Sequence, residues 1–362
     1  MQEMQQPVRI IENLHPSFCH VAEKVIENKR LSREDGHFLF STPHMSSLQL
    51  LADYARQQKV GDDVYYTSSL HLYPTNICEV QCPLCCFYAK PGAKNSWQHT
   101  IEELAEKVKK YLPYGIQKVH ISGGINRTYS LPYYLGLIRS IRKIAPHIYI
   151  KALTVVEIAF LAKYSSFSIE KTLSLLVEAG LDSIPGGGAE ILDDRVRNII
   201  APQKIKSDQF LEIHSLAHKM GIKSNISMLF NHIETIDDIL THLEKVRTLQ
   251  DQTSGFTSFV PLKYFSSRNA LASHPQIKKD PKRIIALSRL MLDNIKNIKV
   301  LWNYLGVNEA KELLLYGGND MGSSAIEEQI TPGKDQINEE TMKSIIISLG
   351  RRPKKRSIQV KR

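Results

Sequence analysis

Four of the five cysteines in the chain lie within nine residues, in the stretch NICEVQCPLCCFYAK at 76–90. They are Cys78, Cys82, Cys85 and Cys86. Thiolates bind soft metal ions and iron–sulfur clusters, and clustered thiols in a chain without a secretory leader are more often metal ligands than disulfide partners. A structural zinc site usually takes further ligands from a second knuckle, and the sequence has no second cysteine cluster. The stretch therefore predicts a metal site of another kind.

The spacing Cys78-x3-Cys82-x2-Cys85 suits one compact cluster held from a single loop. Complete thiolate ligation of a four-iron cluster takes four cysteines. Three protein ligands leave one iron open to bind a substrate, as a catalytic zinc site keeps one open position. We expect Cys86 to project away from the cluster and Cys19 to be a core residue of a helix. The alternative explanation of the clustered cysteines is a zinc knuckle or a few buried thiols.

The composition is that of an ordinary globular protein. The chain has 362 residues, of which 42% are hydrophobic and 23% charged, so we expect one large domain or two of ordinary size. The N-terminus, MQEMQQPVRI, has no apolar signal-peptide core, and no stretch approaches the ~18 uncharged apolar residues of a membrane span. We therefore expect a cytoplasmic protein that does not associate with membranes.

The formal net charge is +10, and basic residues are frequent near the end of the chain, in RRPKKRSIQVKR at 351–362. A basic chain can bind nucleic acid, but the rest of the positive charge lacks the aromatic interleaving of a single-strand binder. We interpret the end as a solvated terminal segment and expect no nucleic-acid partner. An anionic small substrate fits a mildly basic protein equally well. A zinc- or RNA-binding module is the alternative from a different functional class.

Apolar strand-like runs alternate with amphipathic helical stretches over most of the chain. Residues 8–65 are expected to be helical, and strands are expected at 68–74, 118–124, 148–154, 181–187, 222–229, 255–262 and 298–306, with a weaker eighth near 313–318. Parallel strands at this spacing predict an α/β fold, a (β/α)8 TIM-type barrel with an N-terminal helical extension. The expected organisation is an extension at 1–65, a barrel at 66–335, and a basic tail at 336–362 that packs on or near the barrel.

The residues suited to chemistry follow the ends of the expected strands. The cysteine stretch follows the first strand, and Ser122, Gly123 and Gly124 follow the second. Active sites of such barrels lie at the carboxyl ends of the strands. The cysteine loop is therefore expected at the catalytic face.

The cysteine spacing followed by Phe87 resembles the signature of the radical S-adenosylmethionine (SAM) enzymes. This resemblance implies a barrel of the radical SAM kind, a [4Fe–4S] cluster on Cys78, Cys82 and Cys85, and SAM bound at its open iron. It also implies that Phe87 contacts the cofactors and that the backbone of Ser122-Gly123-Gly124 meets the SAM amino group. The continuation Ile125-Asn126-Arg127 departs from the leucine-histidine-proline of close relatives.

Four further stretches resemble enzymes of the futalosine route to menaquinone, which include aminofutalosine synthases and dehypoxanthine futalosine cyclases. They are SIPGGGAEILDDRVR (183–197), KSNISMLFNHIET (223–235), RTLQDQTSGFTSFVPLKY (247–264) and RLMLDNIKN (289–297). The second and third are more similar to the synthases, and the resemblance extends over nearly the whole chain. It implies a transferase that adds the 5′-deoxyadenosyl radical to 3-[(1-carboxyvinyl)oxy]benzoate with loss of bicarbonate. Flavodoxin or ferredoxin is the implied electron donor, and the cyclase or another radical SAM enzyme is the alternative.

Several residues after the later strands are candidates for SAM binding. The glycines at 186, 187 and 188 let backbone approach a ligand closely, and Glu190 can accept hydrogen bonds from the SAM ammonium or ribose. A tight strand-to-helix turn explains the three glycines equally well. Thr154 and Glu157, after the third strand, are further candidates for polar contacts.

The implied substrate carries two carboxylates, so a cationic side chain is expected near it. Arg268 follows the sixth strand and offers a planar fork for a carboxylate. Asn225 and His232 flank the end of the fifth strand and could orient substrate or assist decarboxylation, although an isolated histidine is more often structural. His214 and His218 have helical spacing but no third ligand at a suitable offset, so no zinc site is expected there.

Overall fold

The computed structural model describes residues 7–265, 271, 278–324, 326, 327, 329 and 337–357, with side chains from residue 10 onward. The strands are β1 (Asp63–Thr67), β2 (Ser69–Leu72), β3 (Lys118–Ile121), β4 (Tyr149–Ala152), β5 (Ser183–Ile184), β6 (Lys223–Phe230), β7 (Phe256–Lys263), β8 (Asp320–Ser323) and β9 (Arg352–Lys355). The predicted Arg268 and the predicted boundary between barrel and tail at 335/336 lie outside the described residues.

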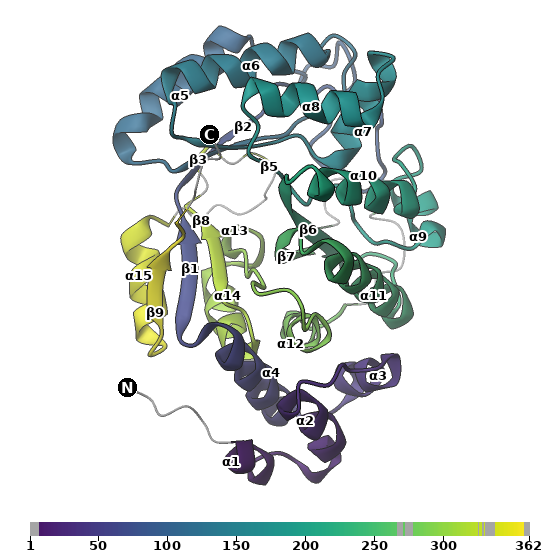
Figure 1. The fold of residues 1–362 in the computed structure, drawn as a ribbon, viewed down its shortest axis with the longest axis vertical. Helices are drawn as coiled ribbons and strands as arrows, with labels where there is room; N and C mark the ends of the chain where they lie inside the picture. Colours follow the sequence, from purple (N-terminus) through teal and green to yellow (C-terminus); the bar gives the residue numbers. More distant parts are fainter. Residues whose placement is uncertain are drawn as a thin grey trace.

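Helices cover the outside of the strands (Figure 1). They are α1 (Pro7–Glu12), α2 (Cys19–Ile26), α3 (Arg33–Ser41), α4 (Met45–Val60), α5 (Ile101–Tyr111), α6 (Leu131–Ile144), α7 (Val155–Tyr164), α8 (Ile169–Ala179), α9 (Asp194–Ile200), α10 (Ser207–Lys219), α11 (Ile236–Thr253), α12 (Pro281–Met291), α13 (Trp302–Leu305), α14 (Val307–Leu313) and α15 (Glu339–Ser348). None of these described helices is long and apolar enough to span a lipid bilayer.

Parallel pairings connect eight strand positions into a ring. Strands β2 to β7 form one sheet in sequence order, and β8, β1 and β9 form a second. Isolated parallel bridges continue the ring from Phe259 to Ile298 and from Lys299 to Asp320, while β8 pairs with β1. Because β1 leads directly into β2, with only Ser68 between them, the ring returns to its start. The predicted α/β barrel is confirmed.

Four helices begin with the same reciprocal cap. In each, a serine or threonine accepts a hydrogen bond from the third helical N–H, and the acidic residue there accepts one from the N-cap backbone. The pairs are Ser32 with Asp35, Thr100 with Glu103, Thr154 with Glu157 and Thr235 with Asp238. Three of the four caps start the helix that follows a barrel strand or its loop, so short-range sequence sets where these helices begin.

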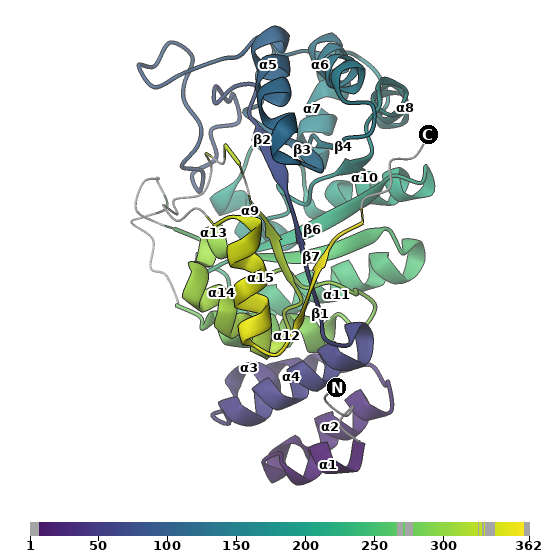
Figure 2. The same cartoon turned by 90° about the vertical axis from the view of Figure 1, so that its left-hand side faces the viewer.

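The first four helices lie at one end of the barrel, as Figure 2 shows from the side. Arg33 of α3 donates to Glu244 of α11 at 2.7 Å, and Arg283 of α12 donates to the carbonyl oxygens of Phe40 and Thr42. The helical run was predicted to reach residue 65. It ends at Val60, and β1 begins at Asp63 after Gly61, whose φ of 57° reverses the chain.

Two predictions about the last strands are wrong. Residues 298–306 contribute only single bridges at Ile298 and Lys299 before Trp302–Leu305 turns helical. The eighth strand is Asp320–Ser323, not 313–318, where the chain stays helical as far as Tyr316. The apolar run at 313–316 packs a helical face, whereas the true strand begins with a buried aspartate and contains a glycine, which hides its strand pattern.

Two expectations were stated for the basic end, a solvated segment and a tail that packs on or near the barrel, and its described residues depart from the first. Arg352–Lys355 forms β9, which pairs in parallel with β1 over four residues. The Arg351 guanidinium lies 2.6 Å from Asp53, and Arg356 donates to the buried carboxylate of Asp320 at 2.5 Å. Acidic residues of α4 and of the barrel therefore form ion pairs with the basic segment and hold it in place.

Candidate active site

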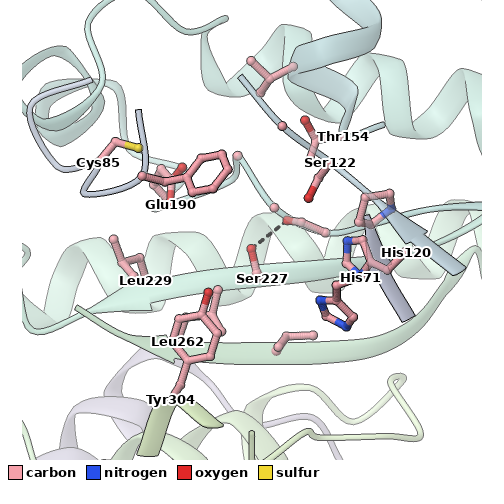
Figure 3. Close-up of a pocket in the computed structure, with 18 of the residues that line it drawn as sticks. His71, Cys85, His120, Ser122, Thr154, Glu190, Ser227, Leu229, Leu262 and Tyr304 are labelled. Carbon is pink, nitrogen blue, oxygen red and sulfur yellow. Dashed lines mark hydrogen bonds between the residues drawn. The ribbon is translucent and has the colours of Figure 1, made fainter. Parts of the chain in front are cut away.

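A cavity of about 480 Å³ opens at the carboxyl ends of the barrel strands. Figure 3 shows Cys85 and Glu190 on one side of it and His71 and His120 on the other. Predicted site residues that line it are Cys78, Cys82, Cys85, Phe87, Ser122, Gly123, Gly124, Thr154, Gly186, Gly187, Gly188, Glu190 and Asn225. Cavities in barrels of this class are the usual place for substrate, so this cavity is the candidate active site.

The cysteine loop is closed by its own backbone hydrogen bonds. Thr75 forms an antiparallel bridge with Gln98, the Cys78 N–H donates to the Ala89 carbonyl at 3.2 Å, and the Ala89 N–H donates to Asn76 at 2.8 Å. These bonds close the loop, and the Leu84 N–H, which donates to the Ile200 carbonyl of α9 at 3.3 Å, attaches it to the rest of the barrel.

The thiols of the loop differ in burial and in their neighbours. Cys82 is buried, Cys78 and Cys85 are half-buried, and Cys86 is exposed although it also borders the cavity. Burial raises the pKa of Cys82 to about 11 and also raises that of Cys85. The backbone N–H groups of Phe87 and Tyr88 donate to the Cys85 sulfur and oppose this shift of its pKa. These donors favour a thiolate at Cys85.

Lys204 is a half-buried cation beside the cysteines that the sequence analysis missed. It lines the cavity, and its charge lowers the pKa of both Cys82 and Cys85 against the effect of burial. Within the described residues, no three His, Cys, Asp or Glu side chains are close enough to hold a single metal ion. Three thiols bordering one space, with a lysine to offset thiolate charge, fit a [4Fe–4S] cluster.

The glycines after β3 are required by the cysteine loop. A Cβ atom on Gly124 would lie 2.1 Å from the carbonyl oxygen of Ile77, and one on Gly123 would lie 2.9 Å from that of Thr75. The Gly124 N–H donates to Thr75 at 2.8 Å. Only glycine allows the two loops to approach this closely. The motif therefore positions the thiols, in addition to the SAM contact that the resemblance implies.

Glu157 connects this glycine turn to α7. One carboxylate oxygen accepts from the Gly123 N–H at 3.1 Å, and the other accepts from the N–H and hydroxyl of Thr154, both at 2.7 Å. Burial raises the pKa of Glu157 to about 7, although these three donors act in the opposite direction. Thr154 and Glu157 both line the cavity, but the carboxylate of Glu157 is already engaged by the protein.

The three glycines after β5 have different roles. A Cβ atom on Gly186 would lie 2.7 Å from the backbone of Ile226 in β6, and Gly188 has φ of 87°. The backbone geometry of the turn therefore requires glycine at both positions. Gly187 faces only Thr154, at 3.3 Å, and is the one best placed to let a ligand approach. The turn interpretation therefore holds for two of them, and the ligand interpretation remains for the third.

Glu190 pairs with Lys204 at the cysteine end of the cavity. The Lys204 ammonium donates to the carboxylate, and Glu190 itself has φ of 48°, in the left-handed region. Burial by itself would raise the pKa of Glu190, but the charge of Lys204 holds it below its usual value. Glu190 is therefore an ionised carboxylate inside the cavity, suited to a cationic ligand group.

Asn225 and His232 occupy different environments. Asn225 lines the cavity, where its side-chain oxygen accepts from Thr257 at 2.8 Å. His232 does not line it and is fully buried, with Nε2 2.9 Å from the Leu229 carbonyl and Nδ1 3.0 Å from Glu234. The turn after β6 folds the imidazole back under the strand end, so its predicted place in the pocket is wrong.

The inward faces of several barrel strands are polar, which the sequence analysis did not use. His71, His120, Lys118, Lys151 and Lys299 all line the cavity. In KVHIS at 118–122, Lys118, His120 and Ser122 alternate with the buried Val119 and Ile121. A parallel strand buried on both faces normally has a continuous apolar run, so this alternation was an available signal for a polar interior.

Several enzymes are similar in amino-acid sequence to this chain over nearly its full length. The aminodeoxyfutalosine synthase of Thermus thermophilus is 37% identical over 351 residues, covering 94% of this chain and 94% of that protein. The aminodeoxyfutalosine synthase of Streptomyces coelicolor is 34% identical and covers 92% and 91%. A 5-amino-6-(D-ribitylamino)uracil–L-tyrosine 4-hydroxyphenyl transferase of Methanococcus maripaludis is 33% identical and covers 91% and 96%.

Family models and solved structures agree with this similarity. Residues 72–246 match the radical SAM superfamily, and residues 253–361 match the CofH/MqnC C-terminal region. The fold is similar to that of methylornithine synthase (PylB), with a TM-score of 0.74 at 17% identity over 92% of this chain and 97% of that one. Radical SAM enzymes use a [4Fe–4S] cluster and SAM, so the predicted cofactors and the predicted enzyme class are confirmed. The chain belongs to the radical SAM superfamily, within the family that includes the aminodeoxyfutalosine synthases.

Proposed function

We propose that the chain is an aminodeoxyfutalosine synthase of menaquinone biosynthesis. It would join the 5′-deoxyadenosyl group of SAM to the enolpyruvyl carbon of 3-[(1-carboxyvinyl)oxy]benzoate, with release of methionine and bicarbonate. We place this activity in the cytoplasm, with reduced flavodoxin or ferredoxin as the electron donor. The two relatives of that name, at 37% and 34% identity, support the assignment.

The structural observation that carries the proposal is the distribution of charge in the cavity. The cysteine end presents the carboxylates of Glu157 and Glu190, whereas the interior of the barrel presents lysines and histidines. SAM is cationic at its sulfonium and ammonium groups, and the benzoate substrate is a dianion. Glu190 is ionised at the cysteine end, and an anion bound among the lysines would restore their ammonium forms, so one cavity would offer each reactant groups of opposite charge.

The residues of this chain would have separate roles in the reaction. Cys78, Cys82 and Cys85 would hold the cluster, which when bound supplies the electron that cleaves SAM. Glu190, held ionised by Lys204, would bind the SAM ammonium or ribose, and Asn225 would orient the second substrate. The enclosing barrel would exclude water from the reactive carbon, since a primary radical abstracts hydrogen from exposed groups.

Labelled SAM distinguishes this reaction from that of the futalosine cyclase. Reconstituted protein would be incubated without oxygen with the enolpyruvyl benzoate, a reductant and SAM labelled in its adenosyl ribose. We expect the label in the large product, together with unlabelled methionine and bicarbonate, and no turnover by the Cys82→Ala variant. Label found only in free 5′-deoxyadenosine would refute the synthase assignment and favour the cyclase.

A further inference from the structure

Three lysines project into the barrel, two from the neighbouring strands β3 and β4 and one from the position between β7 and β8. Lys118 is the first residue of β3, Lys151 lies in β4 opposite His120, and Lys299 bridges to Asp320. All three border the cavity that the cysteines also border. Lys118 and Lys151 are each 8% exposed, so more than nine-tenths of each residue is withdrawn from solvent. We call these three residues the lysine floor.

Among the described residues, a single carboxylate, that of Asp320, pairs with the lysine floor. Asp320 lies 3.8 Å from Lys299, but the same oxygen already accepts from Arg356 at 2.5 Å. Among the described residues, no side chain forms an ion pair or hydrogen bond with Lys118 or Lys151. Four basic groups thus share one aspartate. Burial, followed by repulsion from neighbouring cations, lowers the pKa of Lys118 to about 7 and that of Lys151 well below its usual value.

This arrangement is unfavourable in the protein alone. A buried ammonium without a partner is strongly disfavoured, whereas apolar side chains of similar size would fill the same space without that cost. Packing therefore does not explain lysines at two such positions. An anionic ligand in the cavity would supply the missing partners, and its own charge would restore the ammonium forms.

We propose that the lysine floor binds a carboxylate of an aromatic dicarboxylate substrate, a proposal that rests on the synthase function proposed above. His71 and His120, whose ring centroids are 4.9 Å apart, also line the cavity and extend its polar lining beyond the lysine floor. Once its ammonium groups are charged, the floor repels cations, so it also directs the sulfonium and ammonium groups of SAM to the end where Glu190 lies. Lys118 and Lys151 would thus determine substrate specificity as well as affinity.

Equilibrium binding of simple aromatic ligands tests the floor directly. The probes are benzene-1,3-dicarboxylate, benzoate and the neutral benzene-1,3-dicarboxamide, titrated calorimetrically into the full-length reconstituted protein without oxygen. We expect the affinity to fall in that order. Lys118→Met and Lys151→Met should each weaken dicarboxylate binding tenfold or more, which corresponds to about 1.4 kcal/mol. Lys143→Met, an exposed change on α6, is the matched control and should bind as the parent does.

Two results would overturn the proposal. One is dicarboxylate affinity unchanged in both lysine variants, and the other is binding of the diamide as tight as that of the dicarboxylate. The synthase function fails separately, through the labelling experiment. If dicarboxylate binding depends on the two lysines but no labelled product forms, the lysine floor stands and only the synthase reaction is refuted. Labelled product with an unchanged KM for the benzoate in both variants would refute only the floor.

Discussion

Replacing Lys118 with methionine should stabilise the folded chain, and more strongly at pH 6 than at pH 9. The pKa of this ammonium is 10.5 without perturbation and about 7 in the folded protein, because the side chain is buried beside other cations. Below pH 7 both the folded and unfolded states carry the proton, so the folded state bears the full cost of the buried charge. Between pH 7 and 10.5 the folded state loses its proton first, and the free energy of unfolding rises with pH.

The size of the effect follows from the same two pKa values. A fall from 10.5 to about 7 corresponds to about 5 kcal/mol of destabilisation at pH 6, of which about 2 kcal/mol remains at pH 9. Methionine fills similar space without a charge. The advantage of Lys118→Met over the parent should therefore shrink by about 3 kcal/mol between these pH values.

Urea denaturation at several pH values measures this difference, since urea adds no salt to screen the charges. Lys143→Met is again the control, because its exposed ammonium should leave the pH dependence of the parent unchanged. The reasoning is refuted if the parent and Lys118→Met show parallel curves of unfolding free energy against pH. Parallel curves would mean that Lys118 has a partner or is solvated in the folded state.

Three further changes test the cysteine loop and the C-terminal segment. Gly124→Ala places a Cβ atom 2.1 Å from the Ile77 carbonyl oxygen, so iron content after reconstitution should fall sharply, and a full complement of iron would contradict the close approach. Cys86→Ala should retain iron and SAM cleavage while Cys85→Ala loses both, and the reverse result would make Cys86 the third ligand. Deletion of 351–362 removes β9 and the ion pairs of the segment, so it should cost about 3 kcal/mol or more in unfolding free energy. An unchanged thermal midpoint would show that the segment is only loosely attached.

The cysteine spacing and the alternation of strands with helices predicted a barrel and a cluster on three thiols, and the resemblance carried by the same cysteines added SAM. Both are short-range signals, because three thiols within eight residues share one loop whatever surrounds it, and a buried strand needs apolar residues along its own length. The strand prediction was wrong at Asp320–Ser323, where the buried aspartate is neutralised by Arg356 and Lys299. Those partners are distant in the sequence or lie at another strand position, so no local sequence pattern predicts the pairing.

In the candidate site, too, some features were predictable from the sequence and others depended on contacts between distant segments. Thr154 and the glycines at 123 and 124 were found from their positions after strands, although what makes glycine necessary, the approach of the cysteine loop, is a contact between separate segments. His232 has the same kind of position after β6. The turn that follows buries it against the Leu229 carbonyl and Glu234. Position in a sequence places a residue near a strand end but does not set the direction of its side chain.

The sequence by itself determined the class of fold, the cluster ligands proposed here and the start of four helices, because each depends on residues a few positions apart. The tertiary structure alone decided which side chains meet inside the barrel. Lys118, Lys151 and Lys299 come from strand positions separated by more than thirty residues, and Lys204 reaches Glu190 and the cysteines from a loop. Their proximity depends on strand register and ring closure, which bring charges together only when the whole barrel has formed.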